Sequence, residues 1–149
     1  MIVTGLESIK RAHQHLLART EDAIRQAEDV AGRHAIEQVD TNPTFKPRTG
    51  NLQRQTGYKL IKVGGRILRV FNKAAYAGAI DQGARPHVIA ARRKQFLRFM
   101  GRNGNWVFRR SVNHPGNKPY KFLFKATQSA GRVLADTLHR EMEQIAKDF

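Results

Sequence analysis

The sequence predicts an α+β fold in which a long N-terminal helix and a C-terminal helix pack on a mostly antiparallel sheet of β-hairpins. Apolar residues recur every three or four positions near both ends of the chain, which is typical of amphipathic helices. Between these ends, β-branched and aromatic residues are interrupted by glycine and proline, which is typical of short strands and turns. A chain of 149 residues fits one such domain.

We divide the predicted domain, residues 1–149, into four segments. They are a long helix (1–40), a proline-containing loop (41–56), a basic β region (57–119) and a C-terminal helix (120–149).

The first helix is expected from about Thr4 to Val39. Thr4 and Glu7 have the spacing of a capping box, and Pro43 ends the helical pattern. At 1.5 Å per residue the helix is about 50 Å long, which is more than a compact domain of this size needs. We therefore expect part of this helix, together with the loop from Thr41 to Asn51, to contact other subunits; alternatively, the small residues Ala23, Ala27 and Ala31 allow the helix to approach the chain's own sheet closely. A threonine or asparagine of that loop is expected to cap a short turn through 52–56.

The basic β region should begin with a hairpin. Residues 58–63 and 67–71 are rich in strand-forming residues, and two glycines and an arginine separate them. A helical turn within 74–80 and a short strand over 87–90 are expected to follow.

A second hairpin is predicted between two apolar runs, residues 96–100 and 106–112, that flank Asn103–Gly104. This dipeptide is the strongest local signal for a two-residue type I′ turn. Such a turn places Phe99 opposite Phe108 and Arg98 opposite Arg109. Like charges that face each other in a ladder cost free energy unless they are screened. One interpretation is a solvated outer face; the other is an anion-facing stripe of Arg98, Arg102 and Arg109.

The chain should close with a tight turn and a helix. In the turn, residues 113–116, Pro115 presets the first corner and Gly116 tolerates a positive φ. Helical spacing then continues from about Tyr120 to Lys147.

The formal charge of +15 is concentrated in the middle of the chain. Residues 1–56 carry 8 Lys or Arg against 7 Asp or Glu, residues 57–122 carry 15 against 1, and residues 123–149 carry 4 against 4. A positive field of this density attracts polyanions or acidic partners. The residues expected to face DNA or an acidic neighbour are Arg92, Arg93, Lys94, Arg98, Arg102, Arg109 and Arg110.

Residue types that support catalysis are sparse, and we expect no enzyme, no cofactor and no bound metal. The chain has no cysteine, and Asp81 is the single acid of the basic region. His87 and His114 both occupy turn motifs and could approach each other, but no cluster of acids accompanies them. The N-terminus has no pattern of a signal peptide, and no apolar run is long enough to span a bilayer.

An ordered set of short motifs resembles a known protein family. The set comprises residues 48–52, Tyr76–Ala77, residues 80–83, residues 85–87, the hairpin of residues 97–108, residues 114–116, Pro119 and Phe122–Leu123. In this order and spacing it resembles the head-tail joining and tail-completion proteins, or minor tail proteins, of long-tailed double-stranded DNA phages. The resemblance covers roughly residues 48–126, and Ala84 and Ala90–Ala91 depart from the family's pattern. The turn residues that match are Gly50, Gly83, Pro86, His87, Gly104, His114, Pro115 and Gly116.

The resemblance implies a structural subunit of the virion neck or tail that is made in the host cytoplasm. Such subunits form a homo-oligomeric ring, of about six or twelve copies, around the DNA channel. It implies contacts with neighbouring connector and tail proteins and non-specific contact with packaged double-stranded DNA, but none with a membrane.

Two other functions remain open at this point. The chain could be a free nucleic-acid-binding protein that uses an arginine-rich sheet, with Tyr58, Phe96 or Trp106 as stacking platforms. Metal-dependent turnover would instead indicate a hydrolase or nuclease.

Overall fold

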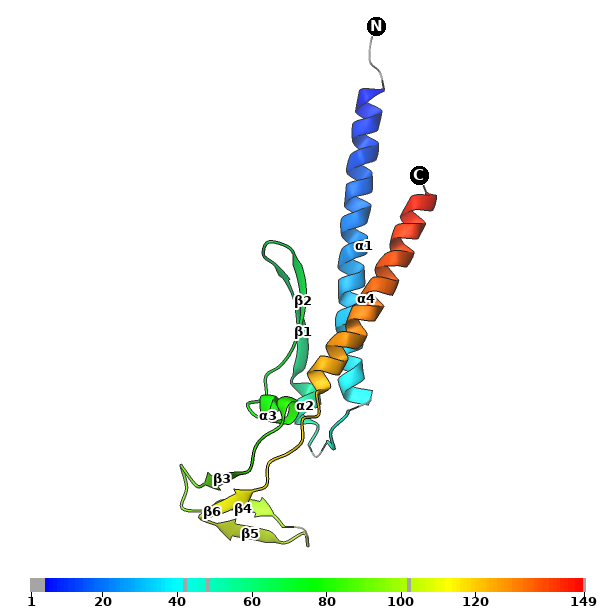
Figure 1. Ribbon diagram of the computed structural model, residues 1–149. Helices are drawn as coiled ribbons and strands as arrows, with labels where there is room; N and C mark the ends of the chain where they lie inside the picture. Colours follow the sequence, from blue (N-terminus) through cyan, green and yellow to red (C-terminus); the bar gives the residue numbers. More distant parts are fainter. Residues whose placement is uncertain (1–4, 42, 48, 102, 149) are drawn as a thin grey trace. The chain divides into compact units, whose positions relative to one another are not determined.

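The computed structural model describes residues 5–41, 43–47, 49–101 and 103–148. The fold is α+β as predicted, with the long helices at the two ends of the chain and antiparallel ladders between them (Figure 1). The chain divides into two compact units. A helical unit contains residues 1–74 and 122–149, and a basic unit contains residues 75–121. The basic unit is therefore inserted into the sequence of the helical unit.

Two antiparallel helices, α1 (Leu6–Thr41) and α4 (Phe122–Lys147), form the centre of the helical unit (Figure 1). The predicted bounds agree with them to within two residues, while the capping residue Thr4 lies outside the described residues. Small side chains fill the seam between the helices and allow a short interaxial distance. The buried seam residues include Ala23, Ala27, Ala31, Ala35, Ala126 and Ala130.

The start of α1 extends past the end of α4 (Figure 1). Near the last turn of α4, Arg19 donates a hydrogen bond to Asp148 at 2.6 Å. Among the described residues of the helical unit, no helix lies beside the turns before Arg19 (Figure 1), and Leu6, Ile9 and Leu17 are exposed there.

The first hairpin, β1 (Thr56–Lys62) and β2 (Arg66–Asn72), packs on α1. Arg66 of β2 donates to both carboxylate oxygens of the buried Glu28, at 2.9 and 3.0 Å, and to Glu21 at 2.8 Å. The Tyr58 hydroxyl donates to Asp29, and the Tyr58 ring lies against Gly32 of α1. A Cβ at Gly32 would lie 2.3 Å from that ring, so this contact requires a glycine.

The proline-containing loop carries an aromatic anchor. Phe45 meets Phe122 of α4 edge to face, with ring centroids 5.1 Å apart. The prediction that a threonine or asparagine side chain caps the following turn is wrong. Helix α2 (Asn51–Arg54) begins after Gly50, which has a left-handed φ of 66° and makes no side-chain cap. Asn42 and Arg48 of this loop lie outside the described residues.

In residues 75–101 and 103–121, the basic unit contains one short helix and two separate two-stranded ladders. After α3 (Ala77–Gln82), β3 (His87–Ala90) pairs with β6 (Ser111–His114), and β4 (Leu97–Met100) pairs with β5 (Trp106–Arg109). The predicted strand over 87–90 is confirmed, whereas β6 was not separated from β5 in the sequence. Within the described part of this unit, only Ala77 is buried.

Glycines with positive φ shape the turns of the basic unit. Gly83, Gly104 and Gly116 have φ values of 84°, 78° and 79°. At Gly116 a Cβ would lie 2.2 Å from the Ala84 carbonyl oxygen, in the place where Ala84 and Asn117 exchange backbone hydrogen bonds of 3.1 and 2.9 Å. Downstream, Tyr120 and Lys121 donate backbone hydrogen bonds to Ile80 and Asp81 of α3.

The predicted register of the second hairpin is wrong by one residue. Gly101 donates to the Asn105 carbonyl at 2.8 Å, so three residues, not two, form the loop. Gly104 occupies the left-handed position that a three-residue loop requires. Arg98 therefore pairs with Phe108, and Arg109 pairs with Leu97. Because neighbouring residues of a strand point to opposite faces, Arg98 and Arg109 lie on opposite faces of the ladder.

Candidate nucleic-acid interface

The basic unit has far more positive charge than it can neutralise internally. Its sequence holds ten Lys or Arg and one acid, Asp81. Even if Asp81 neutralised one cation, nine would remain for solvent or for groups outside the unit. In the helical unit, by contrast, Arg66 pairs with Glu21 and Glu28, and Arg19 pairs with Asp148. Residues 75–121 therefore carry a net charge of +9, whereas the helical unit, with 17 Lys or Arg against 11 Asp or Glu on more than twice as many residues, carries +6.

Four of the predicted interface cations are exposed, and they lie in the segments that connect the strands. Arg92, Arg93 and Lys94 lie in the connection between β3 and β4, and Arg110 lies between β5 and β6. Arg102 lies outside the described residues. The proposed single stripe of Arg98, Arg102 and Arg109 is wrong, since Arg98 and Arg109 point to opposite faces of their ladder.

One face of the β4–β5 ladder is apolar and aromatic, and we call it the aromatic face. It consists of Arg98, Met100, Trp106 and Phe108, all exposed. The Arg98 guanidinium lies 3.9 Å from the centroid of the Trp106 ring, a cation–π geometry. Trp106 nonetheless keeps 53% of its surface exposed, and Phe108 keeps 55%.

A second arginine–aromatic contact, at a longer distance, is made by the residue just before β4 and the residue just after β5. The Arg110 guanidinium is 5.9 Å from the ring centroid of Phe96, and the Phe96 side chain is exposed. Phe96 and Trp106, two of the predicted stacking platforms, are both exposed. Each has an arginine beside its ring, which the sequence alone does not indicate.

Tyr58 is not a stacking platform. Its hydroxyl is bound to Asp29 and its ring packs on Gly32, within the helical unit. The hydrogen bond to Asp29, followed by burial, raises the pKa of Tyr58 above 10.0.

His87 and His114 meet, but they lie in strands and not in turns: His87 begins β3 and His114 ends β6, so the predicted tight turn over residues 113–116 is wrong at its first two positions. His87 pairs with His114 across β3 and β6, and their ring centroids are 5.0 Å apart. His87 Nδ1 lies 2.8 Å from the Arg85 carbonyl oxygen, and His114 Nδ1 accepts a hydrogen bond from the Gly116 amide. Within the described residues, no group of three His, Cys, Asp or Glu could hold a metal ion. Each ring therefore contacts backbone next to its own strand, at the end of the β3–β6 ladder.

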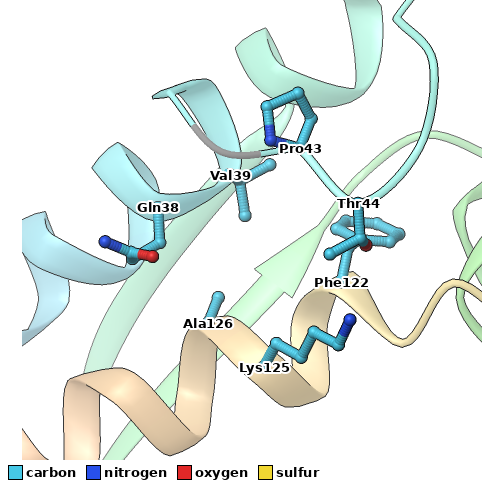
Figure 2. Close-up of a pocket in the computed structure, with 7 residues that line it drawn as sticks. All are labelled: Gln38, Val39, Pro43, Thr44, Phe122, Lys125 and Ala126. Carbon is cyan, nitrogen blue, oxygen red and sulfur yellow. The ribbon is translucent and has the colours of Figure 1, made fainter.

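A pocket of about 280 Å³ lies in the helical unit, where α1 ends and α4 begins (Figure 2). Its lining is mainly aliphatic and aromatic, with one cation, Lys125, one amide, Gln38, and the Thr44 hydroxyl; the lining residues are Gln38, Val39, Pro43, Thr44, Phe122, Lys125 and Ala126. This lining contains no acid, histidine or cysteine. Lys125 is the one ionisable side chain among these lining residues.

Sequence reasoning found the cations but missed their arrangement. The β3–β6 pairing, which places His87 beside His114, joins segments more than twenty residues apart and has no local signal. The sequence already placed Trp106 and Phe108 on one face, but the predicted register, one residue off, gave that face Leu97 and Phe99 where the structure has Arg98 and Met100.

Across the described residues, no helix is long and apolar enough to cross a membrane. No family model matches the chain, and neither a curated protein nor a solved structure is similar enough to it to be matched.

Proposed function

We propose that the chain is a structural component of a phage virion neck or tail, a head-tail connector or tail-completion protein that assembles as a ring around the DNA channel and does no catalysis. The observation that supports this most directly is the amount of large apolar surface left uncovered beside a well-packed helical pair. Leu6 and Ile9 at the start of α1 are 49% and 67% exposed, and the basic unit has a single buried residue in its described part. Uncovered apolar surface of this extent marks an interaction site.

Charge provides a second, independent support. A subunit that surrounds DNA benefits from cations that are not neutralised within the subunit, and residues 75–121 hold ten cations against one acid. The ordered turn motifs add to this, because Gly50, Gly83, Gly104 and Gly116 all have the positive φ that such turns need.

Mass measurement tests the proposal. Native mass spectrometry and negative-stain microscopy of the purified protein, alone and mixed with phage connector and tail proteins, should reveal a closed ring whose mass is a multiple of 16.9 kDa. A monomer under all these conditions, or turnover of nucleic acid with magnesium, manganese or zinc, would contradict the proposal.

The start of α1 is the contact to probe by substitution. We expect Ile9→Lys to weaken ring formation, because it places a charge in the apolar stripe of the projecting turns. Val63→Lys is the matched control: Val63 is 76% exposed, next to the β1–β2 turn, and stands apart from that stripe. Equal oligomer masses for both variants would place the subunit contact elsewhere.

A further inference from the structure

We propose that the aromatic face of the β4–β5 hairpin binds single-stranded nucleic acid, with bases stacked on Trp106 and Phe108 and phosphates beside Arg98. This site is additional to the proposed ring and does not depend on it. It is argued from the register, the exposure of the rings and the charge around them.

The register places two rings where successive bases can use them. Trp106 and Phe108 are two residues apart on β5 and point to the same face, about 6.8 Å apart along the strand. A single strand can extend beyond the 3.4 Å base spacing of a duplex and present neighbouring bases to both rings. Exposures of 53% and 55% leave ring surface available for this stacking.

Arginine supplies the phosphate contact at the same place. The Arg98 guanidinium lies 3.9 Å from the Trp106 ring centroid, so a base stacked on the exposed part of the indole brings its phosphate near a cation. The exposed Arg92, Arg93 and Lys94 precede β4 and extend the positive charge of the segment. Aromatic platforms in a positively charged groove or surface are the usual means of binding single strands without sequence preference.

The composition of the face favours a single strand over a duplex. Bases of a duplex are paired and stacked inside the helix, where exposed rings cannot reach them, whereas bases of a single strand are available for stacking. Three of the four side chains on the face offer a π surface or a guanidinium plane, and Met100 is the fourth. An acidic protein partner would also be attracted by the charge, and the experiment below separates it from nucleic acid.

Titration with a fluorescein-labelled oligothymidylate of about 12 nucleotides tests the site. Trp106 is the only tryptophan of the chain, so its emission reports directly on the face. We expect quenching of that emission on binding, a duplex of equal length to bind more weakly, and affinity to fall steeply between about 50 and 200 mM salt.

Substitutions assign the roles of the individual side chains. Trp106→Ala and Phe108→Ala should each weaken anisotropy-measured binding by about 5- to 150-fold, while Trp106→Phe should keep most of it. Arg98→Gln should reduce the slope of log affinity against log salt by about 0.7. Phe124→Ala and Arg132→Gln, both at exposed positions of α4, are matched controls that should leave binding unchanged.

Four results would overturn the proposal. One is equal affinity for the duplex and for the single strand together with no effect of Trp106→Ala. Another is polyglutamate changing the Trp106 emission as strongly as the oligonucleotide does, which would indicate an acidic protein partner. Circular dichroism checks that each variant folds. If Trp106→Ala does not fold, the third result applies: loss of binding by a folded Trp106→Phe variant would show that stacking on this ring is not the mode of binding. Ring formation without oligonucleotide binding would end this proposal and leave the proposed function intact.

Discussion

At the scale of single residues, the contact between Gly32 and Tyr58 fixes how the first hairpin approaches α1. The aromatic ring occupies the space that any side chain at position 32 would need, and its hydroxyl is bound to Asp29 one turn earlier. Two guanidinium nitrogens of Arg66 bind the buried carboxylate of Glu28, which lies one helical turn before Gly32. With the further bond from Arg66 to Glu21, the hairpin is held to the helix by one steric contact and three polar ones.

Gly32→Ala should lower the free energy of unfolding of the helical unit by about 1–3 kcal/mol, because the added methyl group overlaps the Tyr58 ring. Gly131→Ala in α4 is the matched control. Nothing lies within 4 Å of the position of its Cβ, so alanine should stabilise the helix by about 0.5–1 kcal/mol. Urea unfolding followed by circular dichroism measures both, and a loss at both positions would contradict the steric explanation.

The Tyr58 hydroxyl should make stability depend on pH in the alkaline range. Its pKa is raised in the folded state by the hydrogen bond to Asp29, so above pH 10.0 the unfolded state loses its proton first. This contribution is complete below pH 10.0 and is lost as the pH rises through the folded pKa. The unfolding free energy of Tyr58→Phe should fall less over this range than that of the wild type. Parallel pH profiles for the two proteins would refute the assignment.

At the scale of elements, α4 depends on its first residue. Phe122 is 3% exposed and meets Phe45 of the proline-containing loop, so it joins α4 to the end of α1 through that loop. The next aromatic residue of α4, Phe124, is 62% exposed. Substitutions at these two positions therefore separate the effect of burial on stability from the effect of helix propensity.

We expect Phe122→Ala to cost about 3–5 kcal/mol of unfolding free energy, the typical loss for a buried phenylalanine. Phe124→Ala, two residues further on in the same helical turn, should be nearly neutral. Chemical unfolding of both variants gives the comparison. A similar loss for the two variants would show that helix propensity, not burial, determines it.

The sequence predicted the elements well where a local pattern determines them. Apolar spacing gave α1 and α4, and the residue composition around Gly64–Gly65 gave the β1–β2 hairpin. The β4–β5 register failed because Asn103–Gly104 fits two loops: a type I′ turn, or a three-residue loop with Gly104 in the left-handed position. Local sequence does not choose between these two loops. The slip of one residue in the predicted register exchanged which β4 residues share a face with Trp106 and Phe108.

At the scale of the whole molecule, the two units differ in how much they bury. The helical unit has a continuous seam of buried alanines, whereas the described part of the basic unit buries only Ala77. Two-stranded ladders without a core are marginal in water. The expectation of one domain rested on chain length, which contains no information about where buried residues gather.

Amide hydrogen exchange should therefore separate the units in the unassembled protein. Amides of β3, β4, β5 and β6 should exchange by low-energy local opening, while the central turns of α1 and α4 should exchange only with global unfolding of the helical unit. Mass spectrometry of peptic fragments measures both. Equal protection in the two units would show that the basic unit has stability that its burial does not explain.

The insertion of the basic unit also sets the order in which the seam can close during synthesis. Eighty residues separate Thr41 at the end of α1 from Phe122 at the start of α4. At about 5–20 residues per second, the ribosome needs about 4 to 16 s to make that stretch. Newly made α1 must wait for its partner helix for at least this long, with its alanine stripe open to water and to chaperones.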